Sequence, residues 1–369
     1  MKPKLVIIEN NLLSTLSMRE KLMESLSAEF DITILSTGDI HQKKLAAERS
    51  LKVIDIGTCK QNPLGILGYL LRLNKQIRKI RPDLVLTFTI RPAIWGNLIT
   101  RLYGIPTITT ITGTGPLFTR KSLTYGMARI LYKFSIRKTA RVFFQNEEDR
   151  ELFIRHRFVN AAATGRIPGS GVDTDHFRPA TPATDSYFKF LFIGRLVKDK
   201  GIHEYVQACQ LLREKSIPAE FAILGPFWHQ NLRKNTVTRE EIELWNSKGI
   251  INYIGHADDI RPYLSSFDCI VLPSYREGLN NVLLEACSME RPCITTNVTG
   301  CREIIEDGNN GLLCEPRDAH SLAEKMEMMF HFSAEKRHEM GKNGRNKVIK
   351  EFDKKLVIRA YHEAIRELL

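Results

Sequence analysis

Residues 269–285 read CIVLPSYREGLNNVLLE, and this stretch decides how the second half of the chain folds. Its first four residues are an apolar run typical of a buried strand, and apolar residues recur at helical spacing from Val282 onward. A helix starting near Leu279 would leave Glu277 in the turn and place Glu285 on the second helical turn. Ligands bind at the carboxyl edge of open α/β sheets. The spacing alone leaves two interpretations open: two ordinary surface carboxylates, or a pair that addresses one bound molecule.

The same strand-then-helix pattern repeats along the whole chain. Alternation of short apolar runs with helix-period segments is the signature of βαβ units and parallel sheets. It occurs in two sets, which predicts an α/β fold of two doubly wound Rossmann-like domains facing each other across a cleft. The predicted strands are residues 5–8, 32–35, 84–87, 107–111 and 142–144 in the first set, and 188–193, 221–224, 269–272, 293–296 and 311–314 in the second.

A segment rich in Pro and Thr, RPATPATD at residues 178–185, separates the two sets and reads as an inter-domain linker. A chain of 369 residues also suits two domains better than one core. We therefore expect a first domain over residues 1–180 and a second over 181–350. Residues 351–369 have a helical pattern with one apolar face, which predicts a terminal helix that packs on its own domain or crosses to the first.

Composition narrows the class of protein. The chain is 43% hydrophobic and 26% charged, which is ordinary for a globular protein, and no apolar run reaches the roughly 18 residues of a membrane span. The first ten residues read as a strand and not as a signal peptide, so we expect a cytoplasmic protein. Seven cysteines without a CxxC pair, and histidines without HExxH spacing, indicate neither a disulfide framework nor a metal site.

The net charge of +12 lies entirely in the first half. Residues 1–185 hold 28 basic and 16 acidic side chains, whereas residues 186–369 hold 26 of each. The excess concentrates in residues 60–82 and 113–146, which contain no acidic residue. Such a patch predicts an anionic partner.

A second motif, GRLVKDKG at residues 194–201, directly follows the first strand of the second domain. A glycine-bounded turn before a helix start exposes N–H groups that suit phosphate oxygens, and Arg195 and Lys200 add two positive charges. A basic surface turn is the simpler alternative. The strand before, the helix after and the glutamate pair downstream on the same predicted edge favour a phosphate site.

Taken in order, these motifs resemble the family 4 retaining glycosyltransferases of the GT-B fold. The resemblance covers most of residues 165–369 and rests on GRLVKDKG, on Leu224-Gly225-Pro226, on IGHADDI at 254–260, on PSYREGLNNVLLEA at 273–286 and on DGNNGL at 307–312. In the first half it rests on IPGSGVDTDHFRP at 167–179 and on TGTGPLF at 112–118, which looks like a loop of members that extend polyprenyl-diphosphate-linked sugars.

The resemblance implies a role for each motif residue. Arg195 and Lys200 would hold the diphosphate of a nucleotide sugar, UDP-linked in the commonest case, and offset the charge that grows on the leaving group. Glu285 would bind the ribose and Glu277 the transferred sugar, beside the backbone of Gly278, Leu279 and Asn280. Gly225 and Gly255 complete the donor set, and neither a cofactor nor a metal ion is needed.

The resemblance also implies that residues 1–180 bind the acceptor and residues 181–350 the donor. Acceptor binding is implied for Thr112, Gly113, Thr114 and Gly115, with a lipid-linked sugar as acceptor. Three departures from the family pattern stand out: Asn280 occupies a position where relatives often have Pro, residues 9–12 read ENNL where many have a Gly-Gly loop, and residues 107–118 lack a histidine that is common in the first domain of relatives. Two near-motifs carry no site. Residues 113–118 lack the third glycine of a dinucleotide motif, and Asp173-Thr-Asp175 lies in the segment that enters the linker, where a structural turn is simpler.

Residues 117–142 combine an apolar stripe with a cationic one. Apolar residues recur at helical spacing from Leu123 to Phe134, and Arg129, Lys133 and Arg137 follow one another at four-residue intervals. This pattern is typical of a helix on an anionic membrane surface, although a core-packing helix with a solvated basic face would share it. The favoured hypothesis is a peripheral enzyme on the cytoplasmic membrane face, acting in surface-polysaccharide or glycan assembly.

Three alternatives remain open. A soluble glycosyltransferase acting on a free sugar or small molecule would share the same donor motifs. A GT-B-like sugar epimerase would share the fold but does not call for this Arg, Lys and Glu set. A nucleic-acid-binding protein could use the basic half, although no nucleic-acid-binding motif accompanies it.

Overall fold

The computed structural model describes residues 2–59, 62–113, 123–180, 187–228 and 235–369. Contacts within the chain divide it into two compact units. The first unit comprises residues 1–170 and 354–369, and the second comprises residues 171–353. The helix at the end of the chain therefore belongs to the unit formed by the start of the chain.

The first unit is built on a seven-stranded parallel sheet with the order β3-β2-β1-β4-β5-β6-β7. Its strands are β1 (Lys4–Ile8), β2 (Asp31–Ser36), β3 (Val53–Asp55), β4 (Leu84–Phe88), β5 (Thr107–Ile111), β6 (Arg141–Phe144) and β7 (Thr164–Arg166). Its helices are α1 (Leu12–Met18), α2 (Glu20–Ser27), α3 (Ile40–Glu48), α4 (Pro63–Ile80), α5 (Ile90–Leu102), α6 (Leu123–Ile136), α7 (Glu147–Arg155) and α14 (Lys354–Arg366).

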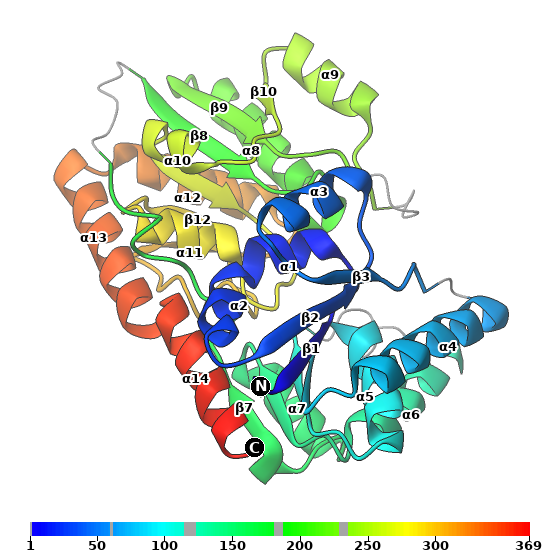
Figure 1. Cartoon of the computed structure of the whole chain (residues 1–369). Helices are drawn as coiled ribbons and strands as arrows, with labels where there is room; N and C mark the ends of the chain where they lie inside the picture. The colour runs from blue at the N-terminus through cyan, green and yellow to red at the C-terminus, as the bar shows by residue number, and fades with distance from the viewer. Residues whose placement is uncertain (1, 60–61, 114–122, 181–186, 229–234) are drawn as a thin grey trace. The chain divides into compact units, whose positions relative to one another are not determined.

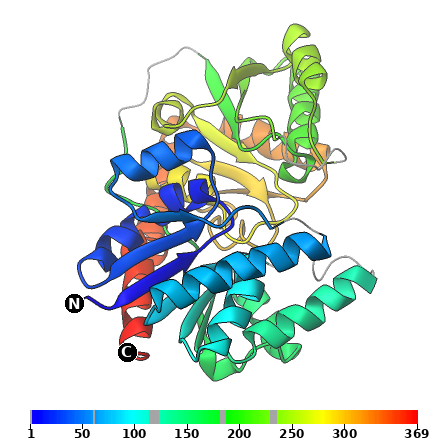
Figure 2. The same ribbon diagram turned by 45° about the vertical axis from the view of Figure 1, so that its right-hand side comes forward.

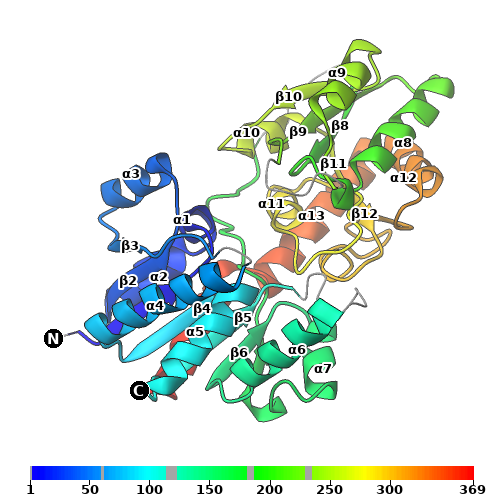
Figure 3. The ribbon, with the colours of Figure 1, turned by 90° about the vertical axis from the view of Figure 1, so that its right-hand side faces the viewer.

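Successive residues of β1 enter two different cores, because side chains alternate across a strand. Leu5 and Ile7 pack with α2 and α14, whereas Val6 and Ile8 pack with α4 and α5. Figures 2 and 3 show α4, α5 and α6 side by side on one face of this sheet, and Figure 1 shows the red α14 beside α2. A strand buried on both faces needs the continuous apolar run that the sequence contains.

The second unit contains a six-stranded parallel sheet with the order β10-β9-β8-β11-β12-β13. Its strands are β8 (Phe188–Ile193), β9 (Ala219–Leu224), β10 (Asn252–Gly255), β11 (Cys269–Leu272), β12 (Cys293–Thr296) and β13 (Gly311–Cys314). Its helices are α8 (Ile202–Glu214), α9 (Arg239–Ser247), α10 (Arg261–Ser266), α11 (Asn281–Ser288), α12 (Ala319–His331) and α13 (Ala334–Glu351). The strand order reverses between β8 and β11, so right-handed crossovers place α8 and α11 on opposite faces.

All ten strands expected from apolar runs are present, and both sheets are parallel. The sequence missed β3, β7 and β10, each of which is an edge strand of three or four residues. Edge strands are paired on one side only, so they need less apolar sequence than central ones. Pairing with an inner neighbour decides their position.

Candidate donor-binding site of the second unit

The proposed donor residues gather where the strand order of the second sheet reverses. β8 and β11 are neighbours in the sheet, and chain segments leave them in opposite directions. The loop after β8 carries Arg195 and Lys200, and the loop after β11 carries Glu277. Such a switch point is where open α/β sheets bind ligands.

Lys200 and Glu277 form an ion pair across this switch point, although they are 77 residues apart in the chain. Their side chains are only 16% and 13% exposed. Together the carboxylate and the ammonium offer one acceptor and one donor group to a ligand. A phosphate would compete for the lysine, and a sugar hydroxyl for the glutamate.

Arg195 lies exposed on the loop after β8, and its guanidinium stands over the Trp228 ring at 4.5 Å from the ring centroid. Stacking on an indole is the strongest of the common cation–π contacts and restricts the orientation of the arginine. Trp228 is not among the predicted donor residues. Its place two residues after the Leu224-Gly225-Pro226 motif could have indicated that it lies near them.

The ends of β8, β9 and β10 meet at Gly225. Its N–H donates to the carbonyl of Gly255 at 2.7 Å, which links two glycines of the predicted donor set. A Cβ placed on Gly225 would lie 1.8 Å from the Gly194 carbonyl oxygen, so no larger residue fits here. The close approach of these two loops sets the position of Arg195.

The turn that carries Glu277 is tied to the loop after β12. The N–H of Glu277 donates to Thr299 and that of Asn280 donates to Gly300, both at 3.2 Å. A Cβ on Gly300 would come within 2.7 Å of Glu277 atoms, and this glycine has a positive φ of 82°. Sequence reasoning missed Thr299 and Gly300, because only the pairing of β11 with β12 brings them to the turn.

Helix α11 begins at Asn281, two residues after the expected Leu279. The reason is Asn280, whose side-chain oxygen accepts the N–H of Leu283 at 3.1 Å and caps the helix. Gly278 and Leu279 lie half-buried in the turn before it, and Glu285 lies half-buried within the helix.

Tyr275 fastens the same turn to the start of α8. Its N–H donates to the carbonyl of Asp199 at 2.9 Å, and its hydroxyl donates to Glu204 at 2.6 Å. The guanidinium of Arg317 covers the ring at 4.6 Å. Burial, followed by the contact with Glu204, raises the pKa of Tyr275 above its ordinary value, so the hydroxyl stays a donor.

The thiol of Cys301 lies close enough to Glu277 for the carboxylate charge to affect its pKa. Cys301 is fully buried, and burial together with the negative charge of Glu277 raises its pKa to about 12. The thiol therefore stays protonated at physiological pH and acts as a small apolar side chain.

Of the four residues predicted to bind the acceptor, Thr112 and Gly113 directly follow β5 of the first unit and are half-buried. Gly113 has a φ of 129°, a conformation that favours glycine. Thr114 and Gly115 lie outside the described residues.

The first unit has its own switch point, between β1 and β4. There the side-chain amide of Asn10 donates to the hydroxyl of Thr89 at 2.9 Å, and Thr89 has an uncommon φ of 70° for a residue other than glycine. Backbone strain of this kind clusters at functional positions. This asparagine belongs to the segment where many relatives have a Gly-Gly loop.

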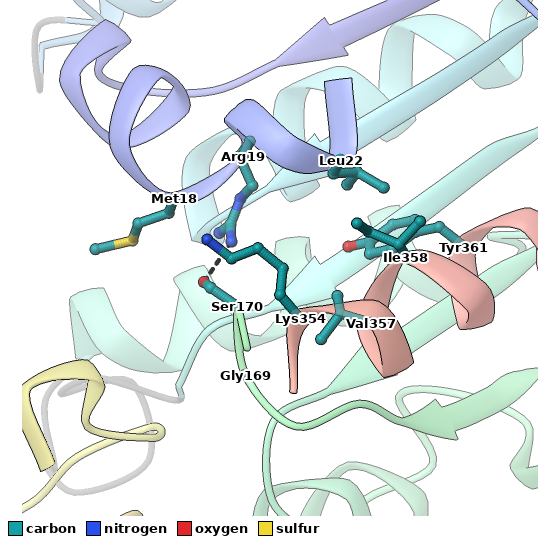
Figure 4. Close-up of a pocket in the computed structure, with 9 residues that line it drawn as sticks. All are labelled: Met18, Arg19, Leu22, Gly169, Ser170, Lys354, Val357, Ile358 and Tyr361. Atoms are coloured by element: carbon teal, nitrogen blue, oxygen red, sulfur yellow. Dashed lines mark hydrogen bonds between the residues drawn. The ribbon is translucent and has the colours of Figure 1, made fainter. Parts of the chain in front are cut away.

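Glu9, one residue earlier, is buried beside Arg19. The pair is 3.9 Å apart, and burial raises the pKa of Glu9 even though Arg19 and Thr15 oppose the rise. Arg19 also stacks on Phe88 at 4.3 Å and donates to Ser170 at 2.5 Å. Figure 4 shows this arginine in a small pocket together with Lys354 and Tyr361 of α14. One arginine therefore connects the end of β1 to the segment where the chain leaves the first unit.

Within the described part of the chain, no three His, Cys, Asp or Glu side chains are placed to hold a metal ion. No helix there has the length and apolarity needed to cross a membrane.

Comparison with known proteins agrees with this geometry. Two doubly wound parallel sheets define the GT-B fold, and the Anabaena protein HepE, solved with UDP and glucose, superposes with a TM-score of 0.81 over 99% of both chains at 16% identity. Residues 173–347 match the family of glycosyl transferases group 1, and residues 11–146 match the glycosyl transferase 4-like family. The two matches together cover most of the chain, and the chain belongs to the family 4 glycosyltransferases that the motifs indicated.

Three relatives are similar in sequence. The Escherichia coli UDP-Gal:alpha-D-GlcNAc-diphosphoundecaprenol alpha-1,3-galactosyltransferase is 28% identical over 77% of this chain and 75% of its own length. The Campylobacter jejuni N,N'-diacetylbacillosaminyl-diphospho-undecaprenol alpha-1,3-N-acetylgalactosaminyltransferase is 23% identical over 90% of this chain and 89% of its own. The Staphylococcus aureus capsular polysaccharide biosynthesis glycosyltransferase CapM is 30% identical, but the match spans only 45% of this chain and 42% of that protein.

Proposed function

We propose that this glycosyltransferase moves a hexose or N-acetylhexosamine from a UDP-sugar to a polyprenyl-diphosphate-linked sugar, with retention of configuration and without a metal ion. The observation that carries the proposal is the Lys200–Glu277 pair beside Arg195 at the switch point of the second sheet. This set supplies two cations for a diphosphate and a carboxylate for a sugar in one place.

Each donor residue would act on a different part of the nucleotide sugar. Arg195 and Lys200 would bind the diphosphate and stabilise the negative charge that develops as the glycosidic bond breaks. Glu277 would hold the transferred sugar, and Glu285 would accept hydrogen bonds from the ribose. The leaving phosphate would take the acceptor proton, so a base on this chain is not required, and the two carboxylates are not a glycosidase-type acid and base.

The acceptor assignment is supported by two relatives whose names specify undecaprenyl-diphosphate-linked sugars and whose matches cover most of this chain. In this chain, Thr112 to Gly115 would contact the acceptor. A soluble transferase with a small acceptor would share the donor site, so the acceptor requires a test of its own.

A position on the anionic, cytoplasmic face of the membrane is supported by the exposed side of the first unit. On α6, Met127, Ile130 and Phe134 are 72%, 71% and 57% exposed. On α4, Leu64 and Leu71 are 81% and 61% exposed, and basic residues continue that exposed side. Exposed apolar side chains flanked by cations, with acidic residues absent from both segments, are typical of helices at anionic bilayer surfaces. A Lys or Arg near such a surface contributes about 1 kcal/mol.

The test is transfer of radiolabelled sugar from a panel of UDP-, GDP- and ADP-sugars into a lipid extract. We expect one UDP-sugar to label the lipid fraction in the presence of EDTA, and Glu277→Ala to reduce the rate at least about a hundredfold, as loss of a charged transition-state contact does. Labelling of a water-soluble acceptor but of no lipid would favour the soluble transferase.

Binding measurements separate the remaining alternatives. Thermal stabilisation by UDP that is lost in Arg195→Ala supports the donor site. Tight DNA binding without any nucleotide response would instead favour a nucleic-acid-binding protein. Interconversion of free UDP-sugars without transfer would identify an epimerase.

A further inference from the structure

The first unit also contains an open groove of about 550 Å³ between α6 and the end of α7. Figure 3 shows the two helices side by side. The groove is lined by Gly126, Arg129, Ile130, Lys133, Leu152, His156 and Phe158. Its volume falls in the range of small-molecule sites.

The lining divides into an apolar part and a cationic part. Phe158 is only 5% exposed and Leu152 is half-buried, whereas Ile130 on the rim is 71% exposed. Arg129 and Lys133 lie one helical turn apart on α6, with Lys133 donating to the backbone carbonyl of His156 at 3.1 Å. A ligand that carries both a negative charge and a hydrocarbon portion complements this lining.

Gly126 gives independent support. It lies inside α6, where glycine costs roughly 1 kcal/mol relative to alanine. Outside its chain neighbours and the backbone of its own helix, no described residue comes within 4 Å of a Cβ built at this position. Among the described residues, no packing contact therefore accounts for a glycine on the α6 side of the groove.

We propose that this groove binds an anionic phospholipid of the bilayer, with the phosphate on Arg129 and Lys133 and the first methylenes of an acyl chain against Leu152 and Phe158. The proposal rests on the membrane position assigned under the proposed function. The exposed Met127, Ile130 and Phe134 of the same helix place the groove beside the surface that would face the lipid. A single bound phospholipid would fix the depth and rotation of the first unit at the membrane.

The experiment is calorimetric titration of the full chain with dihexanoylphosphatidylglycerol below its micelle concentration. Dihexanoylphosphatidylcholine and inorganic phosphate serve as the two comparison ligands. We expect the affinity for phosphatidylglycerol to fall about a hundredfold in Arg129→Gln/Lys133→Gln, because the variant removes two charged hydrogen bonds to the phosphate and each contributes about tenfold or more. Gly126→Leu should abolish binding by filling the groove while keeping the helix folded.

The matched control is Lys342→Gln/Lys350→Gln, which removes the same charge from exposed positions of α13 in the second unit. It should change the affinity less than about twofold, because salt screens the attraction between a single dissolved anion and exposed charges that it does not contact. Three results would overturn the proposal: equal losses of affinity in both double variants, equal binding of inorganic phosphate and phosphatidylglycerol, or unchanged binding in Gly126→Leu. So would displacement of the phospholipid by a short polyprenyl phosphate at equal concentration, which would make the groove an acceptor site. Calorimetry needs no turnover, so a protein inactive with every sugar donor would refute the proposed function and leave this result standing.

Discussion

Asn280 connects the start of helix α11 to the loop after β12, because its backbone N–H donates to the carbonyl of Gly300 and its side-chain oxygen accepts the N–H of Leu283. Replacing Asn280 by Ala removes the cap of α11, which costs about 1 kcal/mol in comparable helices. We therefore expect Asn280→Ala to lower the free energy of unfolding by that amount in urea titrations. Asn280→Asp, which can still accept the Leu283 N–H, serves as the control. Equal loss in both variants would show that the cap is not the source of the effect.

Gly225 and Gly194 offer a matched pair at one loop contact. A methyl group on Gly225 would meet the Gly194 carbonyl at 1.8 Å, whereas a methyl group on Gly194 would have its nearest neighbour at 3.6 Å. We expect Gly225→Ala to destabilise the protein by about 1–3 kcal/mol, as overpacking does, and to weaken nucleotide binding by moving Arg195. Gly194→Ala should stay within about 0.5 kcal/mol of the natural protein. Thermal unfolding with and without UDP measures both effects, and similar behaviour of the two variants would contradict the assignment.

At the same scale, the sequence indicated which residues carry charge but not what holds them. Arg195, Lys200 and Glu277 stand in motifs that can be read directly. Trp228, Tyr275 and Gly300 could not be assigned, because their contacts join loops that are distant in sequence and meet only when the strands pair.

The stability of helix α9 should depend on pH, because the carboxyl of Glu241 takes part in its N-terminal cap. Thr238 and Glu241 cap its start reciprocally, and Glu241 also contacts His203 at 3.0 Å. Burial by itself would raise the pKa of Glu241, but the hydrogen bonds from Thr238 and His203 outweigh it and leave this pKa below 4.5. A carboxyl whose pKa is lower in the folded state adds stability above its unfolded pKa and loses it as pH falls.

Glu241→Gln keeps the shape of the capping residue but cannot titrate. The natural protein should therefore be more stable than Glu241→Gln at pH 7, and the difference should shrink as the pH falls below about 4.5, the ordinary value for this group. Urea unfolding of both proteins at pH 7 and pH 4 tests this. A difference that is constant or grows in acid would be inconsistent with a lowered pKa.

Elements with strong patterns were predictable. Five of the ten expected strands, residues 107–111, 188–193, 269–272, 293–296 and 311–314, have the bounds found in the structure. The start of α11 was not predictable from the apolar pattern, because the side-chain cap at Asn280 sets it. The stripe from Met127 to Phe134 could have faced a core or solvent, and the structure exposes it because Tyr132 and Ile136 occupy the interior instead.

At the scale of the whole molecule, α14 makes the first unit discontinuous in sequence. Val357, Tyr361, Ala364 and Ile365 are buried in the core that contains β1 and β4, and the Tyr361 hydroxyl contacts Thr110. Ending the chain after Asp353 should therefore abolish the unfolding transition of the first unit and leave that of residues 171–353. Scanning calorimetry would show one transition in place of two, or a smaller enthalpy if the two coincide.

Two substitutions refine this prediction without removing the helix. Tyr361→Phe keeps the ring contacts with Phe88 and Phe143 and loses one hydrogen bond, so it should cost about 1 kcal/mol. Tyr361→Ala should cost about 3–5 kcal/mol, as other large core truncations do. An unchanged calorimetric profile after truncation would show that the first unit folds without α14.

The sequence by itself determined the two doubly wound sheets, because strands buried on both faces require continuous apolar runs that few other structures need. It also indicated the charged residues of the candidate donor site, which lie in short motifs at strand ends. Only the tertiary structure decided how Lys200 meets Glu277, which loops hold Arg195 and Glu277 in place, and which unit receives α14. Those outcomes depend on strand order and register, which bring together residues far apart in the chain, and no local pattern encodes them.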